Sequence, residues 1–266
     1  MQFVALMVAK NEEKFLVSSL NSIFKQTKSP DMLYFVDDFS DDKTGEIARK
    51  FDKLQYFHAK DFGFIKQNRQ HGKRIHCLQN KALMRFLRNE WKYLMVIDAD
   101  IVLPKDYCRQ VINHIIKTGC VMVGPKYVET PTKVEVSTDT HIRGCAYIVT
   151  KSFINFCLRR GLHLGTQYGE VLWERLALAN GYKVRALPIK VYQMRETGIT
   201  SEGSFNDGRN LYRLGTPFPA LLSLRGFSLK RFIGYVYALL HQETSLLSKT
   251  ERRNLFRRYL NMKVKL

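Results

Sequence analysis

The chain has 266 residues, of which 45% are hydrophobic and 12% are aromatic. This is enough apolar material for a large core, which excludes an intrinsically disordered protein. The best candidate for a long apolar run, residues 221–240, contains Arg225, Lys230 and Arg231, so we expect no membrane-spanning helix. The first residues lack the basic segment and the small-residue cleavage site of a secretory signal, which predicts a cytoplasmic protein.

Positive charge is concentrated near the end of the sequence. The whole chain carries a net charge of +19, and residues 208–266 contain 12 Lys and Arg but only 2 Asp and Glu. Such a balance points to phosphate groups of nucleic acid, of an anionic membrane surface, or of nucleotide and lipid-linked substrates. We predict two parts, a domain of residues 1–207 and a basic extension of residues 208–266.

The cysteines do not form a pattern that indicates disulfides or zinc. Their number is odd, and no two of them have C-x-x-C spacing. Four lie beside apolar residues in periodic segments, which is typical of buried free thiols. The five are Cys77, Cys108, Cys120, Cys145 and Cys157.

Strands and helices alternate at the start of the chain. Apolar runs at residues 3–8, 32–36 and 54–57 predict three strands, and helical spacing from Leu16 to Phe24 predicts a helix between the first two. We expect the next helix to open after Asp42 or Thr44, either of which is a suitable N-cap. This βαβαβ order predicts a mainly parallel sheet with helices on both faces, in which ligands bind beyond the carboxyl ends of the strands.

The stretch of residues 93–100, YLMVIDAD, predicts a fourth buried strand that ends in paired acids. Asp98 and Asp100 flank the small Ala99, and two carboxylates with this spacing can converge on one hard cation. A solvated acidic turn is the alternative from this stretch alone. Two other strand ends are also polar, with Asn11-Glu12 after the first strand and Asp37-Asp38 after the second.

The third strand instead leads into a basic loop, residues 66–74. Helical spacing resumes at Ile75, so Lys73 and Arg74 lie near the start of a helix, where backbone N–H groups favour phosphate. A solvated basic loop is the alternative.

Four motifs occur in a familiar order: ALMVAKNEE, YFVDDFSDDKT, NKAL at residues 80–83, and VIDADIVLP. Together they resemble the successive signatures of the GT-A fold, family-2-type glycosyltransferases. Residues 143–149 resemble the strand behind the acceptor pocket of that family, and residues 170–177 resemble the helix that starts at the catalytic acid. The resemblance extends to about residue 195. It implies a GT-A, Rossmann-like α/β fold with a C-terminal helical extension.

The same resemblance implies a nucleotide-sugar site. Its first turn binds the donor, Asp38 contacts the base of a uridine-type nucleotide, Asp98 faces the ribose, and Asp100 holds a divalent cation, Mn²⁺ or Mg²⁺. Such cations prefer a few carboxylates together with phosphate oxygens, and they neutralise charge on the leaving diphosphate. With the basic Arg74, the predicted site comprises Ala9, Asn11, Glu12, Asp38, Arg74, Asp98, Ala99 and Asp100.

Glu170 is implied to be the general base that takes the proton of the acceptor hydroxyl in an inverting transfer. The family carries Glu-Asp or Asp-Asp here, whereas this chain has Gly169-Glu170. Glu174 is the second option for the base, and its alternative role is an ion pair on a solvated helix surface. In a further departure, Arg195 lies in the segment where related enzymes often place a His, and a guanidinium can serve phosphate but not a metal.

Two more segments have open roles. Residues 201–209 form either a plain loop or a lid over the bound donor. The spacing of apolar residues from Leu229 to Leu240 predicts an amphipathic helix, and a second, basic helix is expected around residues 252–258. These helices either pack on the core or attach the protein to the inner membrane surface, close to a lipid-linked acceptor.

The expected function is therefore a metal-dependent, inverting glycosyltransferase that uses a nucleotide-diphosphate sugar, of UDP type, and a hydroxyl acceptor on a glycan or a lipid-linked molecule. The alternative is a non-catalytic protein that binds nucleic acid or anionic lipid through its basic tail. The acidic strand ends disfavour nucleic acid, because they repel phosphate unless a metal is present. A nucleotidyltransferase would normally open with a Gly-rich phosphate loop, and AKNEEK contains no Gly.

Overall fold

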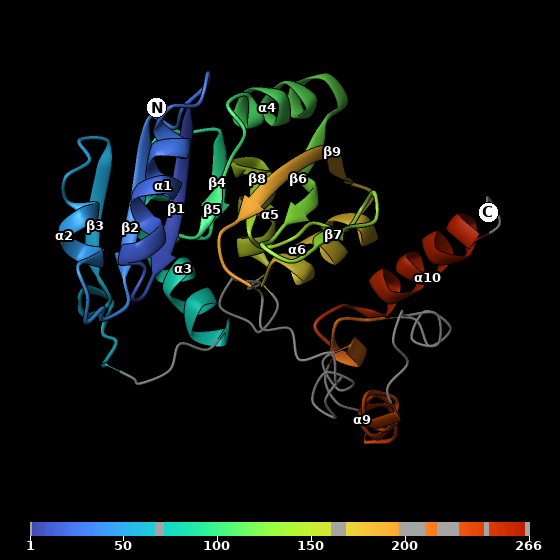
Figure 1. Ribbon diagram of the computed structural model, residues 1–266. Coiled ribbons are helices and arrows are strands. Elements are labelled where there is room, and N and C mark those ends of the chain that lie inside the picture. Colours follow the sequence, from blue (N-terminus) through green and yellow to red (C-terminus); the bar gives the residue numbers. More distant parts are fainter. Residues whose placement is uncertain are drawn as a thin grey trace. The chain divides into compact units, whose positions relative to one another are not determined.

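A computed structural model describes residues 2–66, 72–160, 169–196, 211–216, 229–241 and 245–263 (Figure 1). The chain divides into two compact units. The sheet unit comprises Met1–Glu174 and Lys183–Glu196, and the C-terminal unit comprises Arg175–Tyr182 and Thr197–Leu266. The predicted loop or lid of residues 201–209 lies outside the described residues.

Up to the fourth strand the helices and strands follow one another in the predicted order, and the elements after that strand include several that were not predicted from the sequence. The elements up to the end of the sheet are β1 (Phe3–Ala9), α1 (Glu13–Phe24), β2 (Met32–Asp37), α2 (Thr44–Ala48), β3 (Leu54–His58), the 3₁₀ helix η1 (Ala59–Phe62), α3 (Gly72–Phe86), β4 (Tyr93–Ile97), β5 (Ile101–Val102), α4 (Tyr107–Thr118), β6 (Cys120–Glu129), β7 (Val134–Val136), β8 (Ala146–Thr150), α5 (Lys151–Arg159), α6 (Gly169–Ala179) and β9 (Lys183–Gln193).

In the described residues these strands form one sheet with the order β3-β2-β1-β4-β8-β6-β9-β5, and β7 pairs with β6. The strands β3, β2, β1 and β4 are all parallel, and β6 is parallel to β9. The strand β8 runs antiparallel to both β4 and β6, and β5 runs antiparallel to β9. The predicted α/β fold with a mainly parallel sheet is confirmed, and its second half is mixed.

Helices cover both faces of this sheet. Side chains alternate between the faces of a strand, so neighbours on β2 pack on opposite sides. Phe35 belongs to a core cluster that also contains Leu20 of α1 and Ile112 of α4. Tyr34 points the other way and stacks on Phe86 of α3, with ring centroids 3.8 Å apart. The prediction of helices on both faces is thereby confirmed.

The C-terminal unit contains α9 (Leu229–Leu240) and α10 (Lys249–Lys263), at the two places where helices are expected. Tyr235 of α9 is buried and donates to the carbonyl oxygen of Thr216, 2.6 Å away. Glu251 of α10 accepts a hydrogen bond from Asn180, at 2.8 Å. These contacts hold the described pieces of this unit together.

Two smaller expectations have different outcomes. All five cysteines are free and four are buried, which confirms the prediction of free thiols. Neither predicted residue is the N-cap of the second helix, because α2 begins after Lys43, which makes no side-chain cap hydrogen bond. Asp42 nevertheless accepts from the N–H of Thr44, the first residue of α2, at 2.9 Å. Thr44 and Asp42 also accept hydrogen bonds from the backbone of the loop after β1, at Glu12 and Glu13.

No helix in the described ranges combines the length and the apolar character that crossing a membrane requires.

Candidate functional site

The candidate site begins where β1 and β2 end side by side. Ala9 pairs with Asp37 in the parallel register, and the N–H of Asp38 donates to the carbonyl oxygen of Ala9 at 2.8 Å. Asn11 has a φ of 57°, a left-handed conformation that Asn tolerates better than most residues. In this conformation its N–H donates to Ser40 Oγ at 3.0 Å, and its Oδ1 accepts from the N–H of Asp41 at 2.8 Å. The two strand-end loops are thus tied to each other.

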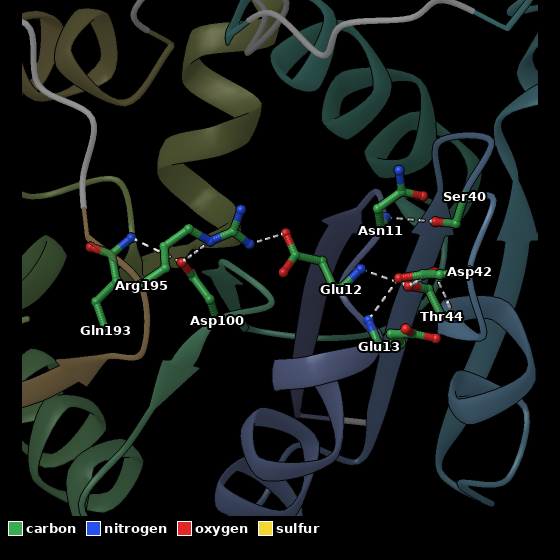
Figure 2. A network of polar contacts seen from close by, with 9 residues as sticks. All are labelled: Asn11, Glu12, Glu13, Ser40, Asp42, Thr44, Asp100, Gln193 and Arg195. Atoms are coloured by element: carbon green, nitrogen blue, oxygen red, sulfur yellow. Dashed lines mark hydrogen bonds and ion pairs between the residues drawn. The ribbon is translucent and has the colours of Figure 1, made fainter. Parts of the chain in front are cut away.

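A second set of hydrogen bonds extends this tie to the start of α1 (Figure 2). The N–H of Glu12 donates to Thr44 Oγ1 at 2.7 Å, and the N–H of Glu13 donates to Asp42 at 3.1 Å. Thr44 Oγ1 in turn donates to Asp42 at 2.5 Å. The backbone of the first turn is therefore held from the second loop, and the Glu12 side chain is left to face the end of β4.

Asp38 and Arg74 form a buried ion pair. Arg74 Nε lies 2.8 Å from Asp38 Oδ2, and Arg74 Nη2 lies 2.5 Å from Oδ1. Arg74 is the third residue of α3, so the predicted position near a helix start is confirmed. Its guanidinium also donates to the carbonyl oxygen of Ile65 at 2.8 Å.

The acids after β4 lie at the same edge of the sheet. The N–H of Asp98 donates to the carbonyl oxygen of Cys145 at 2.9 Å, so this acid follows the last β4–β8 pair. Desolvation, with further contributions from the nearby negative charges of Asp100 and Glu170, raises the pKa of Asp98 well above its usual range. Ala99 is buried between the two acids, and Asp100 is only 4% exposed.

Arg195 joins the first turn to the acids of β4 (Figure 2). Its Nε lies 2.9 Å from Asp100 Oδ2, and its Nη2 bonds Glu12 Oε1. The same Asp100 oxygen accepts from Gln193 Nε2 at 3.2 Å. Burial raises the pKa of Glu12, and the positive charge of Arg195 acts against this rise. The other carboxylate oxygen of Glu12 is buried and has no partner among the described residues.

A pocket of about 190 Å³ lies between α3, the β4 end and the start of α6. Its lining residues are Ile75, His76, Gln79, Val96, Asp98, Gly144, Cys145, Tyr147 and Glu170. Glu170 is in the first turn of α6, with its side chain 19% exposed, and its Oε2 lies 3.6 Å from His76 Nε2. Gly144 leaves the room for this acid, since a Cβ there would lie 3.1 Å from Glu170 Oε1. Asp98 and Glu170 thus face one small space.

Glu174 is not a solvated helix position, so that expectation is wrong. It is 7% exposed, and its Oε2 accepts from the N–H of Ile142 at 2.7 Å and contacts His141 Nδ1 at 3.1 Å. It therefore fastens the segment before β8. Sequence reasoning missed His76, and it placed Gly144 only within the segment of residues 143–149 that resembles the strand behind the acceptor pocket, without a role beside Glu170.

The acids at this edge of the sheet have the charge to bind a divalent cation, but the described residues do not supply a complete set of metal ligands. In the described part of the chain no three Asp, Glu, His or Cys side chains are grouped as ligands of a metal ion. Mg²⁺ and Mn²⁺ at nucleotide sites commonly take one or two carboxylates and draw their remaining ligands from phosphate and water. Asp100 supplies such a carboxylate, and the unpartnered Glu12 oxygen lies in a buried acidic setting beside it.

Fold and strand-end acids together define a protein of the GT-A glycosyltransferase class. The chain belongs to glycosyl transferase family 2, whose model matches residues 4–171. This confirms the family that the sequence motifs indicate. No curated protein sequence matches the chain.

Solved structures with the same fold are distant in sequence. The structure of residues 1–349 of S. aureus TarS in complex with UDP-GlcNAc has a TM-score of 0.61 at 18% identity, covering 80% of this chain and 65% of that one. The mannosyltransferase PcManGT from Pyrobaculum calidifontis, in complex with GDP-Man and Mn²⁺, has a TM-score of 0.57 at 14% identity, covering 96% of this chain and 74% of that one. The chain thus spans slightly less than two thirds of the TarS fragment.

Proposed function

We propose that this protein is a metal-dependent, inverting glycosyltransferase that uses a nucleotide-diphosphate sugar and a hydroxyl acceptor. The observation that carries the proposal is that Asp98 and Glu170 line one pocket, at the edge of the sheet where β1 and β2 also end. Membership of glycosyl transferase family 2 supports the reaction class.

The donor is proposed to lie along the ends of β1, β2 and β4. The tied loops at Ala9, Asn11 and Asp38 offer a rigid edge for the nucleotide, with Asp38 toward the base and Asp98 and Ala99 near the ribose. The similar structures hold UDP-GlcNAc in one case and GDP-Man in the other. We propose a UDP-type donor, because the motif around Asp38 resembles the one that reads uracil.

In the proposed reaction, Glu170 accepts the proton of the acceptor hydroxyl while that oxygen attacks the anomeric carbon. The bond between this carbon and the diphosphate oxygen breaks, and the diphosphate leaves with the electron pair from the opposite side, so the configuration inverts. When bound, a divalent cation held by Asp100 would offset the charge on the leaving diphosphate.

The acceptor is proposed to be a glycan or a lipid-linked molecule. Four exposed apolar residues of α9 recur at helical spacing along one side: Leu229, Ile233, Tyr237 and Leu240. The surrounding residues 208–266 are strongly basic, which supports contact with an anionic membrane surface and a lipid-linked acceptor. The division between a catalytic part, residues 1–207, and this extension also stays a proposal.

A nucleotide-sugar screen tests the proposal. We expect UDP-sugars, with Mn²⁺ or Mg²⁺, to raise the free energy of unfolding by about 2.7 kcal/mol at a hundredfold excess over Kd. Asp100→Asn should lose the metal-dependent part of this gain, and Asp38→Ala should weaken binding of the nucleotide but not of free pyrophosphate. Binding to RNA or to anionic vesicles, without any response to a nucleotide-sugar, would favour the non-catalytic alternative.

A further inference from the structure

The guanidinium of Arg195 lies where a bound cation would contact Asp100, the second acid after β4. Arg195 Nε lies 2.9 Å from Asp100 Oδ2, while Nη2 of the same guanidinium bonds Glu12. Both acids are nearly buried, at 4% and 8% exposure, whereas the Arg195 side chain is 44% exposed. The carboxylate that would bind a metal therefore already has a positive partner.

That partner is a partly exposed side chain, and the residue before it is hydrogen-bonded to the backbone of Asp100. The N–H of Met194 donates to the carbonyl oxygen of Asp100 at 2.9 Å, so the chain beside Arg195 stays next to Asp100 whatever its side chain does. The guanidinium lies over the Phe15 ring at 5.4 Å, and the Arg195 side chain as a whole is 44% exposed. A phosphate group can take it over, because a guanidinium binds phosphate oxygens with two parallel hydrogen bonds.

We propose that Arg195 is an exchangeable counter-ion: it competes with a divalent cation for Asp100 Oδ2 and gives up that oxygen when a donor diphosphate offers it new partners. The inference rests on the proposed function, and it adds that metal binding depends on the binding of the diphosphate. Metal alone binds weakly, because it must displace a cation from a buried carboxylate. Metal and nucleotide diphosphate bind cooperatively, because the diphosphate engages both the metal and the released guanidinium.

The test measures binding of Mn²⁺ alone, from the electron paramagnetic resonance signal of the free ion, for the wild type and for Arg195→Gln. We expect the variant to bind Mn²⁺ more tightly than the wild type, within the range of about 5- to 150-fold that is typical of coupled sites. We also expect UDP to tighten Mn²⁺ binding in the wild type and to do so less in the variant. The matched control is Arg109→Gln, which removes an exposed ion pair with Asp106 outside the site and should leave Mn²⁺ binding unchanged.

A second variant, Arg195→Lys, distinguishes the loss of the guanidinium from a folding defect. Arg195→Lys keeps the charge but loses the two-armed geometry, and it should bind Mn²⁺ with an affinity between those of the wild type and Arg195→Gln. Thermal unfolding of each variant identifies any that is not folded. Adding Asp100→Asn to Arg195→Gln should abolish the gain, which ties it to this carboxylate.

The outcomes separate this inference from the proposed function. Equal or weaker Mn²⁺ binding by folded Arg195→Gln, in a protein whose wild type binds Mn²⁺ with UDP through Asp100, would overturn the exchange alone. A gain that survives Asp100→Asn would also overturn it, since the metal would then lie elsewhere. Failure of Mn²⁺ to bind the wild type with any nucleotide would instead remove the metal from the proposed function.

Discussion

Arg74 holds Asp38 through both carboxylate oxygens, and the two side chains are buried to 8% and 1% exposure. The resemblance assigns this acid to the nucleotide base, and the position of the arginine near a helix start suggests phosphate. In the structure they are each other's partners, so the carboxylate is oriented before a nucleotide arrives. Whether Arg74 also contacts phosphate stays a prediction.

Removing one member of this pair should cost stability. Arg74→Gln removes the cation that bonds both oxygens of a buried carboxylate, and breaking a buried ion pair costs about 3–5 kcal/mol. Urea unfolding measures the change. The control Arg109→Gln breaks an exposed pair with Asp106 and should cost about 1 kcal/mol or less. Similar small losses for both variants would show that the Asp38–Arg74 pair is not a structural anchor.

Glu170→Gln should separate binding from turnover. The base contacts the acceptor hydroxyl rather than the nucleotide, so we expect donor affinity to be unchanged and the transfer rate to fall by about 10²–10⁴-fold. The variant's remaining activity should also lose the acidic limb of the wild-type pH profile. Calorimetry with donor, together with steady-state rates, checks both expectations.

Glu174→Gln is the companion variant, and the structure changes its expected effect. Glu174 is buried and accepts from the N–H of Ile142, so the variant should lower the free energy of unfolding by about 1–3 kcal/mol. Its rate per folded molecule should stay close to that of the wild type. A dead Glu174→Gln beside an active Glu170→Gln would move the general base by four residues.

Gly144→Ala should impair catalysis through the position of Glu170. A Cβ at residue 144 would lie 3.1 Å from both Cδ and Oε1 of Glu170, so the carboxylate must shift. The contact requires a shift of only a few tenths of an ångström, whereas a misplacement of about 1 Å can cost on the order of 10²-fold in rate. We therefore expect kcat to fall by clearly less than about 10²-fold, with little change in donor Kd or thermal stability. The shorter side chain of Glu170→Asp avoids the clash with the new Cβ. The double variant Gly144→Ala, Glu170→Asp should therefore lose less kcat than the product of the losses in the two single variants.

Glu12 should make stability fall as the pH rises. Burial raises its pKa above 4.5, against the lowering effect of Arg195, so above that pH the folded chain binds more protons than the unfolded chain. The free energy of unfolding contributed by Glu12 therefore declines as the pH passes from 4.5 through the folded-state pKa. Urea unfolding across this pH range should show that the free energy of unfolding of Glu12→Gln increases relative to that of the wild type as the pH rises.

Local patterns in the sequence determined the first half of the fold. The apolar runs that predict β1, β2, β3 and β4 end within a residue of the observed strands, because a strand's apolar run and its polar end are properties of neighbouring residues. The order of the motifs also determined the family. A parallel sheet then brings the polar ends of β1, β2 and β4 to one edge without further information.

Tertiary structure alone decided the partners of the charged residues. Arg195 meets Glu12 across 183 positions of sequence, Asp38 meets Arg74 across 36, and Glu170 depends on the space left at Gly144. The periodicity of apolar residues in the sequence does not predict these contacts, because each depends on which strands are neighbours in the sheet and on the length of the side chain. The antiparallel pairing of β8 with β4 places the Cys145 carbonyl oxygen at the N–H of Asp98, and this pairing is a property of the sheet rather than of a local run of residues.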